Sequence, residues 1–219
     1  MSKIYCFGDS WAYGAELKET EKPFVHWFAE ELGIEYTNLG QEGASLGIVL
    51  HTLVMNIDKI TADDIVLVII PPDVRWYDEN ASQGFYSLMQ WMKEDYMKSL
   101  NNKTVEWFKY HHLLFIYSIQ KLLDDMGCVY IMAHNYGQLP DNSKYKIPVN
   151  YNKFLSNIDL TNLLSDKHDP WPSYQLKIDG PMHKHDFHGK YFEGNIDHPN
   201  ELGHKQIAEL MLAYYKKND

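Results

Sequence analysis

Short apolar runs alternate with amphipathic segments along this chain, and no other feature of the sequence narrows the possible folds as much. Four runs rich in β-branched or aromatic residues predict strands: residues 3–7, 34–38, 65–70 and 128–133. Segments with helical periodicity lie between and after them: residues 23–32, 44–57, 105–126 and 199–217. Strands that alternate with helices pair in parallel, with helices covering both faces of the sheet. We therefore expect an α/β fold.

The length and composition agree with one folded unit. A chain of 219 residues can bury a sizeable core, so we expect one domain over residues 1–219, with irregular insertions around residues 71–103 and 135–198. The hydrophobic fraction of 45% and the charged fraction of 23% are typical of soluble globular proteins. Cys6 and Cys128 both lie in apolar runs, so we expect two buried thiols and no disulfide framework.

The formal net charge of −10 argues against two classes of partner. Nucleic-acid binding needs clustered Lys and Arg, and an anionic membrane repels an acidic surface. The sequence has neither a basic leader followed by a long apolar stretch nor a run of about 18 apolar residues. We expect no nucleic-acid partner, no membrane partner and a cytoplasmic location. No pattern predicts an oligomeric state.

The stretch GDSWAYG directly follows the first predicted strand, at the edge of the sheet where α/β proteins bind ligands. A serine such as Ser10 becomes a nucleophile only with a base that takes its proton and donors that hold the oxyanion. Near the other end of the chain, His198 stands before Pro199 and an amphipathic helix, where its side chain can reach the same edge. The turn glycines of NLGQEGAS, Gly40 and Gly43, offer backbone N–H groups unobstructed by a side chain.

Three stretches, GDSWAYG, NLGQEGAS and DHPNELGHKQIA, together and in this order resemble the sequence blocks of the SGNH hydrolases, also called GDSL esterases. The resemblance implies a flavodoxin-like three-layer α/β/α sandwich with a mainly parallel sheet. It also implies hydrolysis of ester or acetyl groups, commonly on carbohydrates or lipids, without a metal. By this resemblance Ser10 is the nucleophile and an oxyanion donor through its own N–H, Gly43 is the next donor, and His198 is the base.

The third block departs from the family pattern. The family has an asparagine there as an oxyanion donor, just after the third strand, whereas this chain reads VLVIIPPDVRW. Arg75 is a permanent hydrogen-bond donor that can stabilise an oxyanion or hold an anionic part of the substrate. An ordinary ion pair of Arg75 with Asp73 or Asp78 is the alternative.

The acid that orients the histidine also differs. The family places it three residues before the histidine, where this chain has Asn195, while Asp197 immediately precedes His198. Side chains of adjacent residues usually diverge, so Asp197 needs a kinked backbone to reach the imidazole. Asn195 can orient the ring through its amide oxygen, and a backbone carbonyl can do so too. The orienting group therefore stays open between these three.

Aromatic residues near the predicted nucleophile are candidates for contact with substrate. Trp11 and Tyr13 flank the proposed site, and Trp76 follows the third strand, although Trp11 and Tyr13 can equally pack beneath the first loop. The histidine-rich tract before the last helix has residue types that bind zinc, but it contains no HExxH pattern, so we expect no metal site.

These observations predict a serine-dependent acyl ester hydrolase that acts on a carbohydrate-linked or small-molecule ester and needs no cofactor. The alternative from another class is a binding or assembly module that keeps the fold without the chemistry. A metal-dependent hydrolase that uses the histidine-rich tract is a further alternative.

Overall fold

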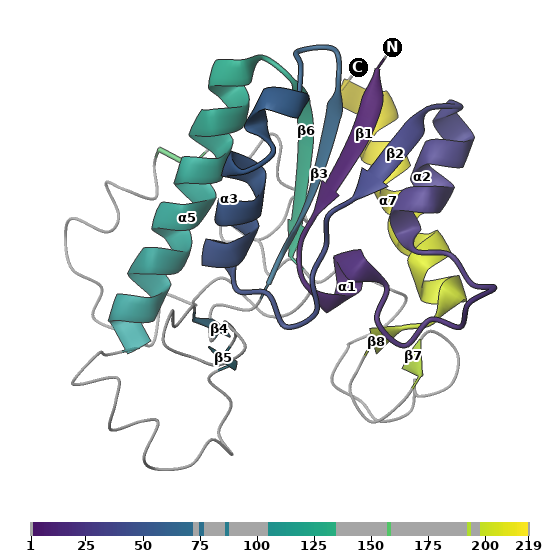
Figure 1. The fold of residues 1–219 in the computed structure, drawn as a ribbon, viewed down its shortest axis with the longest axis horizontal. Helices are drawn as coiled ribbons and strands as arrows, with labels where there is room; N and C mark the ends of the chain where they lie inside the picture. Colours follow the sequence, from purple (N-terminus) through teal and green to yellow (C-terminus); the bar gives the residue numbers. More distant parts are fainter. Residues whose placement is uncertain are drawn as a thin grey trace.

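A four-stranded parallel sheet forms the centre of the molecule. The computed structural model describes residues 2–71, 75–76, 86–87, 105–134, 157–158, 192–193 and 198–218. The sheet has the order β2-β1-β3-β6, from strands β1 (Lys3–Phe7), β2 (Glu35–Asn38), β3 (Ile65–Ile70) and β6 (Val129–His134). Every pairing in it is parallel. The carboxyl ends of the strands therefore meet at one edge, at the bottom of Figure 1.

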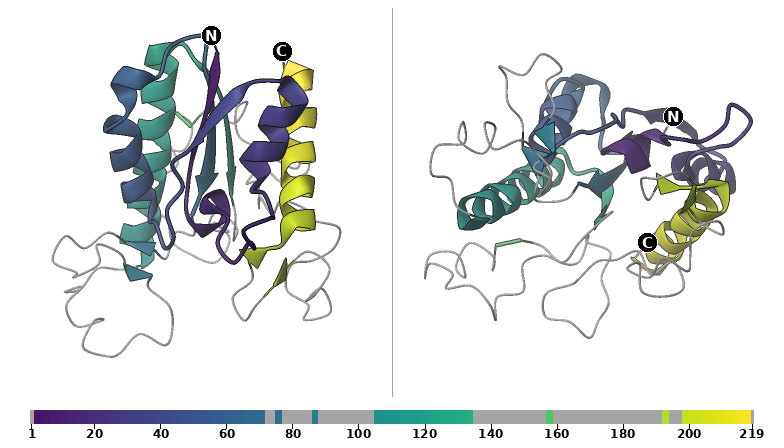
Figure 2. Two further views of the ribbon diagram at one scale, coloured as in Figure 1. Left: turned by 45° about the vertical axis from the view of Figure 1, so that its right-hand side comes forward. Right: turned by 90° about the horizontal axis from the view of Figure 1, so that it is seen from below.

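Within the described residues, two helices cover each face of this sheet. Helices α3 (Leu46–Val54) and α5 (Val105–Met126) lie on one face, and α2 (Phe24–Leu32) and α7 (Glu201–Asn218) lie on the other (Figures 1 and 2). Successive strand residues point to opposite faces, so β1 supplies both cores. Tyr5 and Phe7 pack with α3 and α5, whereas Ile4 and Cys6 pack with α2 and α7. The predicted three-layer α/β/α sandwich is confirmed.

Smaller elements lie outside the main sheet. A four-residue helix, α1 (Ser10–Tyr13), follows β1, and a 3₁₀ helix, η1 (Ile57–Lys59), follows α3. Two short antiparallel pairs complete the described part: β4 (Arg75–Trp76) with β5 (Tyr86–Ser87), and β7 (Phe192–Glu193) with β8 (His198–Pro199). Most of the predicted insertions at residues 71–103 and 135–198 fall outside the described residues.

The expected burial of the two cysteines is also confirmed, since Cys6 and Cys128 are buried free thiols. Burial raises the pKa of the Cys128 thiol to about 11, so this side chain stays neutral near pH 7. Within the described ranges, no helix combines the length and the apolar character needed to cross a membrane.

Candidate active site

Ser10 lies at the start of α1, directly beyond the carboxyl end of β1. The carboxylate of Asp9 caps this helix by accepting a hydrogen bond of 3.1 Å from the N–H of Trp11. At the other end, Gly14 adopts the left-handed conformation, with φ of 87°, and its N–H donates to the Ser10 carbonyl at 3.0 Å. The two caps hold Ser10 in a single helical turn, an element that the sequence analysis did not predict.

The loop after β2 packs tightly against α1. The side-chain amide of Asn38 donates to the Ala12 carbonyl at 2.8 Å, and the N–H of Gln41 donates to the Gly8 carbonyl at 3.0 Å. A Cβ atom added at Gly40 would lie 2.4 Å from the backbone nitrogen of Tyr13, so only glycine fits at this approach. The first and second sequence blocks are thereby held side by side.

Several backbone N–H groups on these loops have no acceptor among the described residues, and two of them belong to predicted oxyanion donors. One is the N–H of Ser10, which opens α1, and the other is the N–H of Gly43. Gly43 has φ of 69° in a turn that the N–H of Ala44 closes by donating to the Gln41 carbonyl at 3.2 Å. Such uncommitted N–H groups can accept an oxyanion as a hydrogen-bond partner.

The Ser10 hydroxyl is buried, with 4% of the residue exposed, and its Oγ has no hydrogen-bond partner within the described part of the chain. A buried hydroxyl without a partner is uncommon, because an unsatisfied polar atom costs about 1–3 kcal/mol. It therefore does not make a hydrogen bond to His198 in this structure. Catalytic hydrogen bonds are often long or misaligned before substrate binds.

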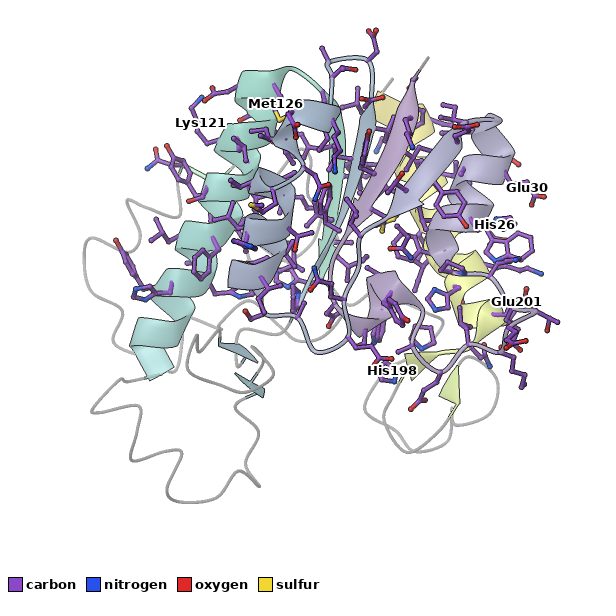
Figure 3. All side chains as sticks on the ribbon, in the orientation of Figure 1. His26, Glu30, Lys121, Met126, His198 and Glu201 are labelled. Atoms are coloured by element: carbon purple, nitrogen blue, oxygen red, sulfur yellow. The ribbon has the colours of Figure 1, made fainter. Side chains whose placement is uncertain are left out.

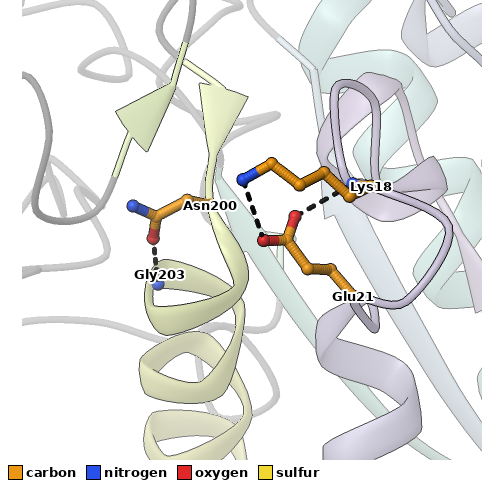
Figure 4. A network of polar contacts seen from close by, with 4 residues as sticks. All are labelled: Lys18, Glu21, Asn200 and Gly203. Atoms are coloured by element: carbon orange, nitrogen blue, oxygen red, sulfur yellow. Dashed lines mark hydrogen bonds and ion pairs between the residues drawn. The ribbon is translucent and has the colours of Figure 1, made fainter.

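His198 comes from the opposite end of the chain and lies at the same edge of the sheet, as its label in Figure 3 shows. It begins β8, which contacts α1. Asn200 then starts α7, with its side-chain oxygen accepting from the N–H of Gly203 at 3.1 Å (Figure 4). This cap fixes the entry of the chain into α7, and with it the position of His198 just outside the helix.

A carboxylate that sequence reasoning missed lies against His198. Oε1 of Glu16 is 3.5 Å from Nδ1 of His198, an ion-pair distance without hydrogen-bond geometry. The His198 side chain is 11% exposed and the Glu16 side chain is 35% exposed. No motif points to Glu16, because it lies in the loop after α1 and meets His198 only through the tertiary fold.

The other predicted site residues are placed as follows. Trp11 is buried in the core with α2 and α7, which is the packing alternative to substrate contact, whereas Tyr13 is 53% exposed at the end of α1. Arg75 and Trp76 form β4, and the structure does not describe their side chains. Asn195 and Asp197 fall outside the described residues. The roles predicted for the side chains of Arg75, Trp76, Asn195 and Asp197 remain predictions.

His204 has a structural role rather than a ligating one. Its Nδ1 accepts a hydrogen bond of 3.1 Å from the N–H of Phe24, the first residue of α2. Burial, assisted by the nearby His198, lowers the pKa of His204 to about 3, so the ring is neutral and can accept. Among the described residues, no three His, Cys, Asp or Glu side chains gather in a group that could hold a metal ion.

Comparisons of sequence and structure give different results. No family model matches the sequence, and no curated protein matches it. Solved structures do match the fold. A lipolytic protein of the G-D-S-L family from Veillonella parvula aligns with a TM-score of 0.56 at 12% identity, over 99% of this chain and 100% of that chain.

Two other solved structures give similar alignments. A protein described as a putative lipolytic protein of the G-D-S-L family, from Desulfitobacterium hafniense, aligns with a TM-score of 0.51 at 13% identity, over 98% of this chain and 99% of that one. A two-domain esterase active on acetylated mannans aligns with a TM-score of 0.52 at 13% identity, over 99% of this chain and 49% of that one. The chain therefore has the three-layer α/β fold of the G-D-S-L lipolytic proteins, an SGNH hydrolase-like fold.

Proposed function

We propose that this protein is a serine-dependent acyl ester hydrolase in which Ser10 is the nucleophile and His198 is the general base. One observation carries the proposal. The buried Ser10 hydroxyl lies on a helix that contacts the strand of His198, and two backbone N–H groups without an acceptor among the described residues lie on the adjoining loops. This arrangement supplies a nucleophile, a base and oxyanion donors at one edge of the sheet.

The reaction proceeds through two acyl transfers. Ser10 Oγ bonds to the acyl carbon while its proton passes to His198, and the N–H groups of Ser10 and Gly43 hold the oxyanion. The ester C–O bond then breaks, and the alcohol leaves with the proton from His198. Water adds to the acyl-enzyme and gives a proton to His198. Cleavage of the bond between Oγ and the acyl carbon releases the acid and returns the proton to Ser10.

Fold likeness and the aromatic residues near the site support the proposed substrate class. We propose a carbohydrate-linked or small-molecule ester, because a protein of this fold is active on acetylated mannans. Tyr13, three residues after the proposed nucleophile at the end of α1, is an exposed aromatic residue, and aromatic rings can pack against sugar faces. Arg75 is proposed as a further oxyanion donor or as the group that holds an anionic part of the substrate.

One observation favours the second candidate, a binding or assembly module without catalysis. Ser10 Oγ makes no hydrogen bond to His198 in the described structure. If the two side chains stay apart when substrate binds, the serine keeps its proton and does not attack. The two candidates therefore differ in whether Ser10 forms a covalent adduct.

Covalent capture separates these candidates. A fluorophosphonate probe should label the wild-type protein at Ser10, and Ser10→Ala should lose the label and lower kcat on p-nitrophenyl acetate by at least about 1,000-fold. Ser118→Ala is the matched control, because the Ser118 hydroxyl donates within α5 to the Leu114 carbonyl at 2.7 Å. This control should label like the wild type. A wild-type protein that is not labelled, under conditions that label an active esterase, would favour the binding module.

A further inference from the structure

We infer that Glu16 is the carboxylate that positions His198 for proton transfer. This role rests on the serine-dependent function proposed above. The sequence left this group open between Asp197, Asn195 and the backbone, all on the histidine's own side of the chain. Glu16 instead comes from the loop that follows the proposed nucleophile. One short segment, residues 10–16, would then supply both the serine and the acid.

The contact between Glu16 and His198 joins an acceptor oxygen to a ring nitrogen that can donate, as a positioning role requires. Glu16 Oε1 lies 3.5 Å from Nδ1 of His198, and that nitrogen has no hydrogen-bond partner among the described residues. A carboxylate on this side favours the tautomer with hydrogen on Nδ1, which leaves the lone pair of Nε2 free to take a proton. It also stabilises the imidazolium that forms when the serine proton is transferred. A small closing movement of this partly exposed side chain would complete the hydrogen bond.

The backbone at Glu16 adopts the left-handed conformation, which is sterically unfavourable for residues other than glycine. Its φ is 66°, and it is the only residue other than glycine with positive φ in the described part of the chain. The left-handed conformation costs a side chain such as that of Glu about 1–2 kcal/mol. Neighbouring hydrogen bonds hold it in place: the N–H of Ala15 donates to the Ser10 carbonyl at 2.9 Å, and the N–H of Leu17 donates to the Gly14 carbonyl at 3.2 Å. Strain of this kind gathers at functional sites.

The nearby acidic residue Glu21 is committed elsewhere. Its carboxylate accepts from the backbone N–H of Lys18 at 2.9 Å and pairs with the Lys18 ammonium at 3.4 Å (Figure 4). Glu21 therefore closes its own loop beside the start of α7. Glu19 is exposed on the same loop. Glu16 is therefore the carboxylate on this loop whose side chain contacts the imidazole. Glu19 serves as a matched control for the removal of charge.

The test compares Glu16→Gln with Glu19→Gln in the full-length protein. Both variants remove one negative charge from the same loop, but only Glu16→Gln removes a carboxylate that contacts His198. Glu16→Gln should lower kcat on p-nitrophenyl acetate by about 10- to 100-fold, less than for a fully buried triad acid, with KM changed by less than about twofold. Glu19→Gln should behave like the wild type in both parameters.

A second variant separates positioning from structural support. Glu16→Gly removes the carboxylate and also relieves the positive φ, so its urea midpoint should equal or exceed that of the wild type while kcat falls. Because Glu16 is partly exposed, added formate can reach the vacated position. Formate should restore part of the lost kcat in Glu16→Gly and none in Ser10→Ala. A purely structural role predicts the reverse pattern, a lower urea midpoint with no response to formate.

The outcomes distinguish this inference from the proposed function. If fluorophosphonate labels the wild type at Ser10 and Glu16→Gln matches Glu19→Gln in kcat, Glu16 is not the positioning group and the serine mechanism stands. If the wild type is neither labelled nor active, both proposals fail together. Loss of kcat in both Glu16 variants, with formate rescue of Glu16→Gly, supports the inference.

Discussion

Gly40 shows how closely a single residue can limit the geometry of the candidate site. An added Cβ would lie 2.4 Å from the Tyr13 nitrogen and 2.7 Å from the Ala12 carbonyl carbon, both backbone atoms of α1. Neither atom can move without displacing the helix that carries Ser10. We expect Gly40→Ala to lower the free energy of unfolding by about 1–3 kcal/mol, as overpacking does, and to slow the labelling of Ser10. Urea denaturation and the rate of fluorophosphonate labelling measure the two effects.

The same substitution at Gly47 provides the control. Gly47 lies in the first turn of α3, where an added Cβ would have its nearest neighbour, Cζ of Phe115, at 3.4 Å. Alanine is also the better helix former, so Gly47→Ala should leave stability unchanged or raise it by up to about 1 kcal/mol. Equal destabilisation by both substitutions would show that the contact between Gly40 and α1 is not the cause.

Sequence reasoning identified some site residues and missed others for a physical reason. Ser10, Gly43 and His198 each lie in a short stretch whose local structure the sequence indicates: a strand end, a glycine turn and a helix start. The structure brings these stretches to one edge, while their catalytic roles remain proposals. Glu16 carries no such local signal, because its contact with His198 spans most of the chain and depends on a loop conformation.

At the scale of elements, α2 depends on α7 for its first turn. The residue before α2 is Pro23, which makes no side-chain cap, so the N–H of Phe24 is satisfied by Nδ1 of His204 instead. The two rings are also nearly parallel, with centroids 6.2 Å apart. A helix N-terminus buried without such a partner is unfavourable. One histidine in α7 therefore links the two helices on this face of the sheet.

We expect His204→Phe to lower the free energy of unfolding by about 1–3 kcal/mol, because it keeps an aromatic ring and leaves a buried N–H unsatisfied. His26→Phe is the matched control on α2, since His26 makes ring contacts with Trp27 and Tyr36. This control should change stability by less than about 0.5 kcal/mol. Urea denaturation at pH 7 measures both. Equal stability of the two variants would contradict the capping role.

The sequence predicted the type and order of the main elements, whereas some boundaries depended on contacts it does not reveal. Residues 44–57 were expected to form one helix, but α3 spans Leu46–Val54. It begins late because the N–H of Ala44 closes the turn that shapes the Gly43 loop. It ends early because the side chain of Asn56 donates to the Thr52 carbonyl at 2.8 Å, after which η1 begins. Helical periodicity continues across such points, so it could not locate them.

At the scale of the whole molecule, three histidines of the described residues are buried in the neutral state, at two separate places. His112 of α5 and His134, at the end of β6, have rings 5.7 Å apart, and His204 lies between α7 and α2. Burial lowers the pKa of His134 and of His204 to about 3. Burial, together with the neighbouring His134, lowers the pKa of His112 well below its usual value. Because burial penalises the charged form, protonation of these rings in the folded protein is unfavourable near neutral pH.

The sign of the resulting pH dependence follows from proton binding. Between about pH 3 and the ordinary histidine pKa of about 6.5, the unfolded chain binds protons at His134 and His204 and the folded chain does not; His112 acts in the same direction below its ordinary pKa. The free energy of unfolding therefore falls as the pH is lowered through this range, and the histidine contribution is fully present above it. Each histidine adds a slope of about 1.4 kcal/mol per pH unit, so the three together give about 4 kcal/mol per unit.

We expect the urea-derived free energy of unfolding to fall steeply between pH 6 and pH 5, before most carboxylates titrate, because the unfolded state gains protons at the three histidines. His204→Phe should reduce the slope by about 1.4 kcal/mol per pH unit, since it removes one histidine that burial keeps neutral in the folded state. His26→Phe, at a partly exposed position of α2, is the matched control for the loss of one histidine. A slope that His204→Phe leaves unchanged would mean that His204 is protonated in the folded state. It could not then accept the Phe24 N–H through Nδ1, so the pH profile and the loss of stability at pH 7 test the same contact independently.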